Sequence, residues 1–355
     1  MTETYTVAII GLGPAGATLA RLLKKDLRVI AIDKKADGGN QKSFQKPCGG
    51  LLAPDAQKTL AEMGLNLQKD ILVDPQIFSV RTIDLDTHKT KFYQRAYLNM
   101  DRHRFDLWLK SHIPENVHTL NNAVCTAVEK RQDGFAVTYE DQGQKTTVNC
   151  KYIVGADGAN SIVRRTLFPG KTETYMSIQQ WFKKGGTNPF YSCVFDKKNT
   201  DCYSWSVTKD DYLIFGGAYK KSNAKESFEN QKAALMQYGF PLEDPIKTEA
   251  CLVMRPKKRK NFYLGKNNAF LIGEAAGLIS FSSLEGISSA LKSGRALAKV
   301  LNMEEGNPHK AYKKATRTLR LSLLLKRYGK APFLYNPLLR RCIMKSGLKT
   351  IRVEE

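Results

Sequence analysis

A glycine-rich turn between a short apolar strand and a helix near the N-terminus constrains this chain more than any other feature. Residues 5–10 predict a buried strand, Gly11-Leu12-Gly13-Pro14-Ala15-Gly16 follows at once, and residues 17–25 have helical spacing. This is GxGxxG in the strand, turn and helix context that a dinucleotide site requires. We expect Gly11 to make the turn, Gly13 to admit a pyrophosphate, and Gly16 to let helix and strand pack closely. Pro14 and Ala15 then begin a helix whose N-terminus faces the phosphates.

A second predicted strand completes this dinucleotide site. Residues 27–32 are mostly apolar and end in Asp33, which stands 22 residues after Gly11. That is close to the ~20 residues expected for the acid that hydrogen-bonds an adenosine ribose. An acid here disfavours a 2′-phosphorylated nucleotide. We assign Lys34, next to Asp33, and Val124 to the same site.

The composition is that of an ordinary globular protein. Hydrophobic residues make up 42% of the 355 residues and charged residues 25%, and 18 apolar residues nowhere run together. Because no export signal is visible at the N-terminus, we expect a soluble cytoplasmic protein. Seven cysteines without a CxxC pair favour reduced thiols and argue against a metal site.

The positive charge is the unusual part of the composition. The formal net charge is +22, and residues 306–355 hold 13 Lys and Arg against two Glu. Residues 315–328 predict a basic helix with an apolar face, which leaves two interpretations open: its leucines dock on the core, or it lies on an anionic membrane at the inner face. A second basic cluster, Arg255 with 257–260, lacks interleaved aromatic residues, so we expect an exposed loop and no nucleic-acid partner.

Three further motifs carry a family resemblance. They are Gly155-Ala156-Asp157-Gly158 with the following Asn160-Ser161, Gly273-Glu274-Ala275-Ala276-Gly277 with Leu284-Glu285-Gly286-Ile287, and Lys46-Pro47-Cys48-Gly49-Gly50. With the N-terminal turn they resemble the FAD-dependent oxidoreductases of the geranylgeranyl reductase family, in the aromatic-hydroxylase-like superfamily, over roughly residues 5–300. Within that family the chain is most similar to the bacterial CbrA-type oxidoreductases.

The resemblance implies that the dinucleotide is FAD. Residues assigned to it from these motifs are Cys48, Gly49, Asp157, Gly273, Glu274, Gly286 and Ile287, together with Arg102, which begins an R-x-x-F-D helix start. In the family the acid at 274 is Asp and bonds a ribityl hydroxyl, whereas this chain has Glu. The chain also has Phe281 in place of Pro and Leu284 in place of Gly. Since only one strand-anchored GxGxxG is present, NAD(P)H is expected to be at most a transient electron donor.

The residues expected to bind substrate indicate a function less specifically than the FAD motifs do. In alkene-reducing relatives a Cys in the position of Cys48 donates a proton, and the other interpretation is a small turn residue packed beside the cofactor. Tyr203 and Trp205 lie two residues apart on a predicted strand and therefore on one face. With Gln179, Trp181 and Tyr191 they either line a substrate cavity or pack in the core of the sheet.

The leading hypothesis is an FAD-dependent reductase that transfers hydride from flavin N5 to a carbon–carbon double bond of a hydrophobic, isoprenoid or lipid-like substrate. The alternative is an FAD-dependent monooxygenase or halogenase that acts through a flavin hydroperoxide. A third class, a flavoprotein whose FAD is structural or whose role is sensing at a membrane, also remains open. The sequence gives no oligomeric state.

The expected fold class is α/β (α+β), with a Rossmann-type FAD-binding domain and a mostly antiparallel substrate sheet. We assign residues 1–75, 100–170 and 256–305 to the FAD-binding domain. Residues 76–99 and 171–255 form the substrate domain, and 306–355 a basic C-terminal helical segment.

Overall fold

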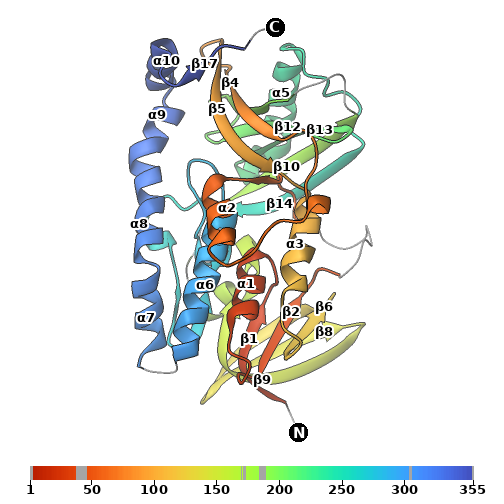
Figure 1. Ribbon diagram of the computed structural model, residues 1–355, viewed down its shortest axis with the longest axis vertical. Coiled ribbons are helices and arrows are strands. Elements are labelled where there is room, and N and C mark those ends of the chain that lie inside the picture. The colour runs from red at the N-terminus through yellow and green to blue at the C-terminus, as the bar shows by residue number, and fades with distance from the viewer. Residues whose placement is uncertain are drawn as a thin grey trace.

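The computed structural model describes residues 3–36, 46–168, 170, 173–183, 189–303 and 306–353. Its strands form two sheets that follow one another along the long axis of the molecule, with a column of C-terminal helices beside them (Figure 1). The N-terminus lies at the end with the first sheet, and the C-terminus lies at the other end.

The first sheet has a parallel centre. Strands run in the order β15-β16-β9-β1-β2-β6, and β1 pairs in parallel with β2 and β9. Antiparallel β8 and β7 extend it from β9. The inner strands are buried on both faces, which explains their unbroken apolar sequence. The bounds are β1 Thr4–Ile10, β2 Val29–Asp33, β6 Val117–Asn121, β7 Val124–Arg131, β8 Gly134–Asp141, β9 Gln144–Gly155, β15 Gly265–Lys266 and β16 Ala269–Leu271.

The second sheet is mostly antiparallel. Its order is β14-β10-β13-β12-β11-β4-β5-β17, with β3 paired to β5, and the pairing of β11 with β4 is parallel. The bounds are β3 Leu51–Leu52, β4 Ile77–Asp84, β5 Lys89–Asn99, β10 Thr174–Lys183, β11 Tyr191–Phe195, β12 Tyr203–Lys209, β13 Tyr212–Tyr219, β14 Lys247–Met254 and β17 Thr350–Ile351. The two sheets and the helical C-terminal segment confirm the expected fold class.

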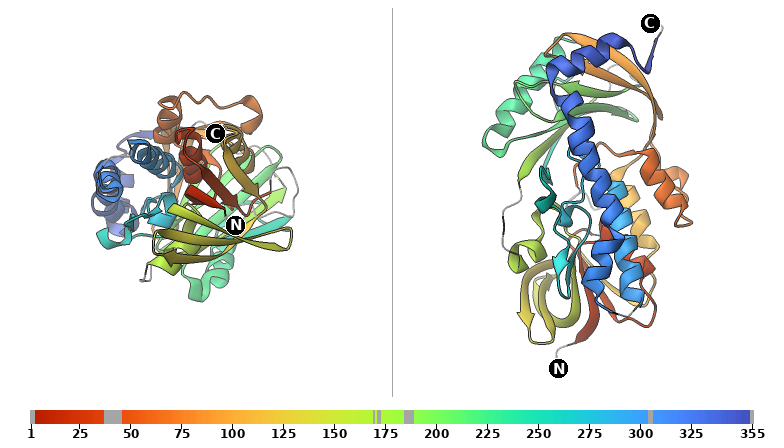
Figure 2. Two further views of the ribbon diagram at one scale, coloured as in Figure 1. Left: turned by 90° about the horizontal axis from the view of Figure 1, so that it is seen from below. Right: turned by 90° about the vertical axis from the view of Figure 1, so that its left-hand side faces the viewer.

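Helices pack around both sheets. Helix α6 lies against α1 beside the first sheet, and α5 covers the second (Figure 1). The bounds are α1 Pro14–Leu22, α2 Pro54–Ala61, α3 Arg102–Ser111, α4 Ile162–Leu167, α5 Ala224–Met236, α6 Ile287–Met303, α7 Pro308–Ala315, α8 Arg317–Leu325, α9 Ala331–Tyr335 and α10 Pro337–Ser346. A π-helical turn, Lys326–Lys330, joins α8 to α9, so α7 to α9 form a column along α6 and both sheets (Figure 2).

Buried ion pairs attach this column to the second sheet. Arg340 on α10 donates from Nε and Nη2 to the carboxylate of Asp84 at 2.8 and 2.7 Å, and from Nη2 to Asp86 at 2.7 Å. The Asp84 side chain is fully buried. Beyond α10, β17 pairs with β5. The C-terminal segment is therefore part of the folded body.

The expected exposed loop at Arg255 and 257–260 is confirmed for Lys258, Arg259 and Lys260, which are exposed, but it is wrong for Arg255. Arg255 is 1% exposed, and its guanidinium pairs with Asp201 at 2.6 Å and lies over the Phe281 ring at 4.1 Å. The charge was visible in the sequence, but its partner is 54 residues away and becomes adjacent only in the fold. Within the described residues, no helix is both long and apolar enough to cross a membrane.

We predict that Arg340→Met lowers the free energy of unfolding by about 3–5 kcal/mol, because it leaves the buried Asp84 carboxylate without its cation. Arg341→Met is the matched control, since Arg341 is the exposed neighbour on the same helix. Equilibrium urea denaturation of the two variants measures the difference. Equal loss in both variants would contradict the assignment.

Candidate functional site

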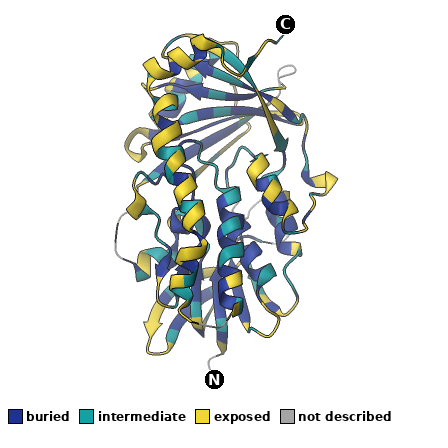
Figure 3. Ribbon diagram, turned by 60° about the vertical axis from the view of Figure 1, so that its left-hand side comes forward, coloured by how far each residue is buried: buried dark blue, intermediate teal, exposed yellow. Residues whose placement is uncertain are grey.

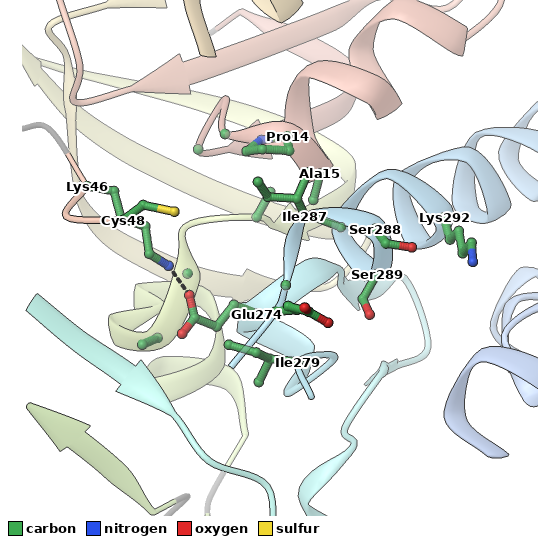
Figure 4. Close-up of a pocket in the computed structure, with 18 of the residues that line it drawn as sticks. Pro14, Ala15, Lys46, Cys48, Glu274, Ile279, Ile287, Ser288, Ser289 and Lys292 are labelled. Atoms are coloured by element: carbon green, nitrogen blue, oxygen red, sulfur yellow. Dashed lines mark hydrogen bonds and ion pairs between the residues drawn. The ribbon is translucent and has the colours of Figure 1, made fainter. Parts of the chain in front are cut away.

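A cavity of about 1410 Å³ lies where the two sheets meet and continues along α6 towards α8. It is lined by the β1–α1 turn, the segment around Cys48, Glu274 and the start of α6 (Figure 4). Predicted site residues in its wall are Gly11, Gly13, Pro14, Ala15, Asp33, Lys34, Cys48, Gly49, Arg102, Val124, Asp157, Glu274, Gly286, Ile287, Tyr191, Tyr203 and Trp205. The structure thus brings together motifs spread over more than 270 residues of sequence.

Four predicted residues do not line this cavity. Gly16 and Gly273 lie just behind it: a Cβ at Gly16 would overlap the Gly11 carbonyl oxygen, and one at Gly273 would meet the Ala15 side chain at 2.9 Å. Gln179 and Trp181 instead donate to the Glu249 carboxylate, at 3.3 and 2.8 Å.

The N-terminus of α1 is open towards the cavity. Gly13 has extended backbone geometry, no side chain caps the helix, and a Cβ added at Gly13 would meet no atom within 4 Å. The first backbone N–H groups of the helix are therefore available to an anion. Space beside Gly13 and close packing at Gly16 fit the two different roles expected for these glycines.

Buried charges surround the predicted ribose end. Asp33, at the end of β2, pairs with Lys110 of α3 at 2.9 Å. Asp106, one turn earlier on α3, pairs with Lys35 at 2.5 Å and with Arg102 at 2.9 Å. Burial raises the pKa of Asp106, but Arg102 and Lys35 outweigh it and lower the pKa to about 2. Asp106 thereby holds the cationic side chain of Arg102 in the cavity wall.

Asp157 carries an unpaired polar atom. Its Oδ2 accepts from the Ile162 amide at 2.6 Å, whereas its buried Oδ1 has no hydrogen-bond partner among the described residues. Burial raises the pKa of this carboxyl group. An unsatisfied buried oxygen in a cavity wall fits a ligand that donates a hydrogen bond there.

Glu274 has protein partners for both carboxylate oxygens. Lys46 Nζ donates to Oε2 (Figure 4). The Met254 amide donates to Oε1 at 2.9 Å. Burial lowers the pKa of Lys46, yet the Glu274 carboxylate more than compensates and the net shift is upward. Lys46 belongs to the Lys46-Pro47-Cys48-Gly49-Gly50 motif, but its pairing with a residue 228 positions away could not be predicted from the sequence.

Cys48 lies between cationic side chains. Its Sγ accepts from the Gly50 amide at 3.4 Å. Burial lowers the pKa of Arg102, but Asp106 and the adjacent Cys48 thiol raise it overall. Next to the loop that follows Cys48, Lys209 Nζ donates to Gly50 O at 3.0 Å, Asn99 Oδ1 at 2.5 Å and Met100 O at 2.7 Å.

Lys209 was missed by the sequence analysis. It is the last residue of β12 and is 5% exposed. Burial lowers its pKa to about 7. Its three contacts fasten the loop after Cys48 to the end of β5. A lysine at the end of a strand is usually a surface residue, so the sequence contains no signal for this role.

Aromatic side chains form the wall opposite α1. A Cβ at Gly49 would meet the Trp205 ring at 3.4 Å and one at Gly216 would meet it at 2.8 Å, so two glycines leave space for this ring. Tyr203 donates to the Ser283 carbonyl oxygen at 2.8 Å. Trp205 Nε1 is buried with no hydrogen-bond partner among the described residues.

These observations fit the expected FAD. The open backbone at Gly13 suits a pyrophosphate, Asp33 a ribose, and the unpaired Asp157 Oδ1 a ligand hydroxyl. The start of α6, with Gly286 and Ile287, faces the same cavity as Cys48. Leu284 has a positive φ of 52°, so it keeps the left-handed backbone of the glycine that the family has there.

Comparison with known proteins supports the same assignment. A family model described as "FAD binding domain" matches residues 4–307. The chain is 48% identical over 350 residues to Protein CbrA of Escherichia coli O6:H1, which covers 98% of this chain and 95% of that protein.

Two solved structures show the same fold. A geranylgeranyl bacteriochlorophyll reductase-like protein from Thermoplasma acidophilum aligns with a TM-score of 0.73 at 18% identity, over 98% of this chain and 88% of that one. The flavin-dependent brominase Bmp2 aligns with a TM-score of 0.69 at 19% identity, over 97% of this chain and 93% of that one.

We predict that Gly13→Ala folds normally but loses FAD. The added methyl group has free space in the protein, and it occupies the place where the pyrophosphate must approach. Gly16→Ala is the matched variant, and we expect it to lower the unfolding temperature because its methyl group overlaps Gly11. Thermal unfolding and flavin absorbance separate the two effects. Full FAD content in Gly13→Ala would contradict the site.

We predict that Lys209 makes stability rise with pH. Between its folded pKa of about 7 and its ordinary value near 10.5, the unfolded chain binds the extra proton. The stability of the wild type relative to Lys209→Met should therefore increase by about 3 kcal/mol from pH 7 to 9.5. Urea denaturation at both pH values measures this, with the exposed Lys220→Met as control. Parallel pH curves for wild type and Lys209→Met would contradict the prediction.

Proposed function

The chain belongs to the FAD binding domain family of flavin-dependent enzymes, and from this premise we propose that it reduces a carbon–carbon double bond of a hydrophobic, lipid-like substrate. The observation that carries the proposal is the position of the Cys48 thiol. It lies in the wall of the same cavity as Trp205 and the start of α6. The fold shared with a geranylgeranyl bacteriochlorophyll reductase-like protein supports it.

The residues that would hold FAD come from three parts of the chain. Gly13 and the α1 N-terminus would bind the pyrophosphate, and Asp33 the adenosine ribose. Asp157 and the start of α6 would contact the remainder. FAD supplies the two electrons of the reduction as a hydride when bound.

The protein's own contribution would be positioning, exclusion of water and proton transfer. Tyr203 and Trp205 form an aromatic wall for an apolar chain. Cys48 Sγ would donate the proton that the second alkene carbon needs. Arg102, next to Cys48, would stabilise the sulfur anion until water returns the proton. NAD(P)H is the proposed electron donor, bound transiently.

The second candidate is an FAD-dependent monooxygenase or halogenase. Lys46 favours it, because an ammonium group in the cavity wall offers a hydrogen-bond donor to an oxidised reactant. Glu274, however, already holds this ammonium group in an ion pair. The Cys48-Gly49 turn against Trp205 favours the reductase.

We predict that Cys48→Ala slows substrate reduction about 10²–10⁴-fold, the usual effect of losing a positioned acid, while FAD stays bound. The test mixes dithionite-reduced protein anaerobically with isoprenoid alkenes such as geranylgeraniol, and follows the return of oxidised flavin and the saturated product. Cys251→Ala is the control, because Cys251 is a second thiol in the same wall.

The alternative predicts a different result. Alkenes would then leave the reduced flavin unchanged, and reoxidation would require oxygen and give an oxygenated or halogenated product. Unchanged reduction by Cys48→Ala, with a saturated product, would keep the reductase but remove Cys48 as its acid.

A further inference from the structure

The outer face of the C-terminal helices combines positive charge with exposed apolar side chains. Residues 306–353 contain 13 Lys and Arg and no Asp or Glu. Arg340 is neutralised by Asp84 and Asp86, but most of the other cations are exposed. This uniform sign sets the segment apart, because the rest of the chain interleaves both signs.

The apolar side chains on this face are large and strongly exposed. Leu321, Leu325 and Tyr328 are 54%, 63% and 61% exposed, and their spacing places them on one side of α8 and the turn that continues it. Further along the column, Phe333, Leu338 and Leu348 are 49%, 72% and 68% exposed. Figure 3 shows the exposed positions following the outside of these helices.

These exposed side chains are not needed to attach the helices to the core. The same helices already bury other side chains against the body: Tyr312, Leu323, Ala331 and Met344 are each at most 4% exposed. The docking of leucines on the core, expected from the sequence, therefore accounts for the inner side only. A second apolar face on docked helices indicates an external partner.

We propose that the outer face of α8 to α10 docks on an anionic lipid bilayer. Leucine, phenylalanine and tyrosine side chains enter the boundary between head groups and acyl chains, and the lysines and arginines around them meet anionic head groups. Nucleic acid fits less well, because binding to phosphates would leave the apolar residues exposed. A bilayer uses both properties of the face at once.

The cavity is close to this face. Helix α8 lines it through Thr318, Leu319, Ser322 and Leu323, of which Thr318 and Ser322 are exposed. The same helix thus borders both the cavity and the docking surface, and a lipid-like substrate in the bilayer would lie beside the site. This last step rests on the proposed function, whereas the docking surface does not.

The test is sedimentation of the FAD-loaded protein with vesicles of phosphatidylglycerol and phosphatidylethanolamine, compared with phosphatidylcholine alone. We expect binding to the anionic vesicles, weakened by salt because exposed charges are screened. The triple variant Leu321→Ser/Leu325→Ser/Tyr328→Ser should bind at least tenfold more weakly. Ile246→Ser is its control, since Ile246 is 52% exposed and precedes β14 at the opposite edge of the second sheet.

A second variant keeps the proposal testable if the first one misfolds. Arg341→Gln/Lys345→Gln/Lys349→Gln removes three exposed charges from the face, and Lys220→Gln/Lys221→Gln/Lys225→Gln removes three exposed charges near α5. Only the first should lose affinity for anionic vesicles.

Three outcomes would overturn the proposal: no binding to anionic vesicles, equal binding by face and control variants, or binding to duplex DNA that exceeds vesicle binding and survives the apolar triple variant. None of these results involves turnover. A failure of the proposed reductase activity would therefore leave the docking result intact, and the reverse also holds.

Discussion

The three hydrogen bonds of the buried Lys209 Nζ fasten the loop after Cys48 to the second sheet beside the site. They join the end of a second-sheet strand, β12, to the backbone of Gly50 and Met100, on the segments that lead into α2 and α3. The Lys46–Glu274 pair fixes the other end of the same short loop to the turn after β16. Cys48 lies between these two anchors, so its position depends on both sheets. A thiol held in this way can present one atom to a ligand with little freedom to move.

The positive charges of the protein fall into two groups, buried and exposed. Part of it is internal: Arg255, Arg340 and Lys209 are buried and matched by carboxylates or carbonyl oxygens. These cations connect segments that are far apart in the sequence, and the cost of burying them is offset only while each partner is in place. The remainder lies on the surface and is concentrated in the C-terminal segment, where residues 306–353 contain no Asp or Glu. Net charge alone does not distinguish the two, since it counts both equally.

The site combines features that suit different flavin chemistries. The open α1 N-terminus and Asp33 indicate a nucleotide-binding site but do not indicate which reaction it serves. The proposed reduction depends on another part of the wall, which contains Cys48, Trp205 and the ammonium group of Lys46 that Glu274 already holds in an ion pair. We regard the position of Cys48 next to Arg102 as the main structural argument for proton donation by the thiol, whereas the Lys46 ammonium group is already paired with Glu274.

The sequence by itself determined the nucleotide end of this protein. Gly11, Gly13, Gly16 and Asp33 follow from local geometry, because a tight turn, a close backbone approach and a strand end are decided within about 30 residues of chain. Two other results needed the tertiary structure. Lys209 and Lys46 acquired their partners from residues more than 100 positions away, and Gln179 and Trp181 face Glu249 although their strand was correctly expected. Periodicity tells which residues share a face of a strand, but the sheet's neighbours and the sign of nearby charges decide what that face meets. The same reason applies to the C-terminal helices, where packing against the core buries Leu323 and leaves Leu321 and Leu325 on the surface.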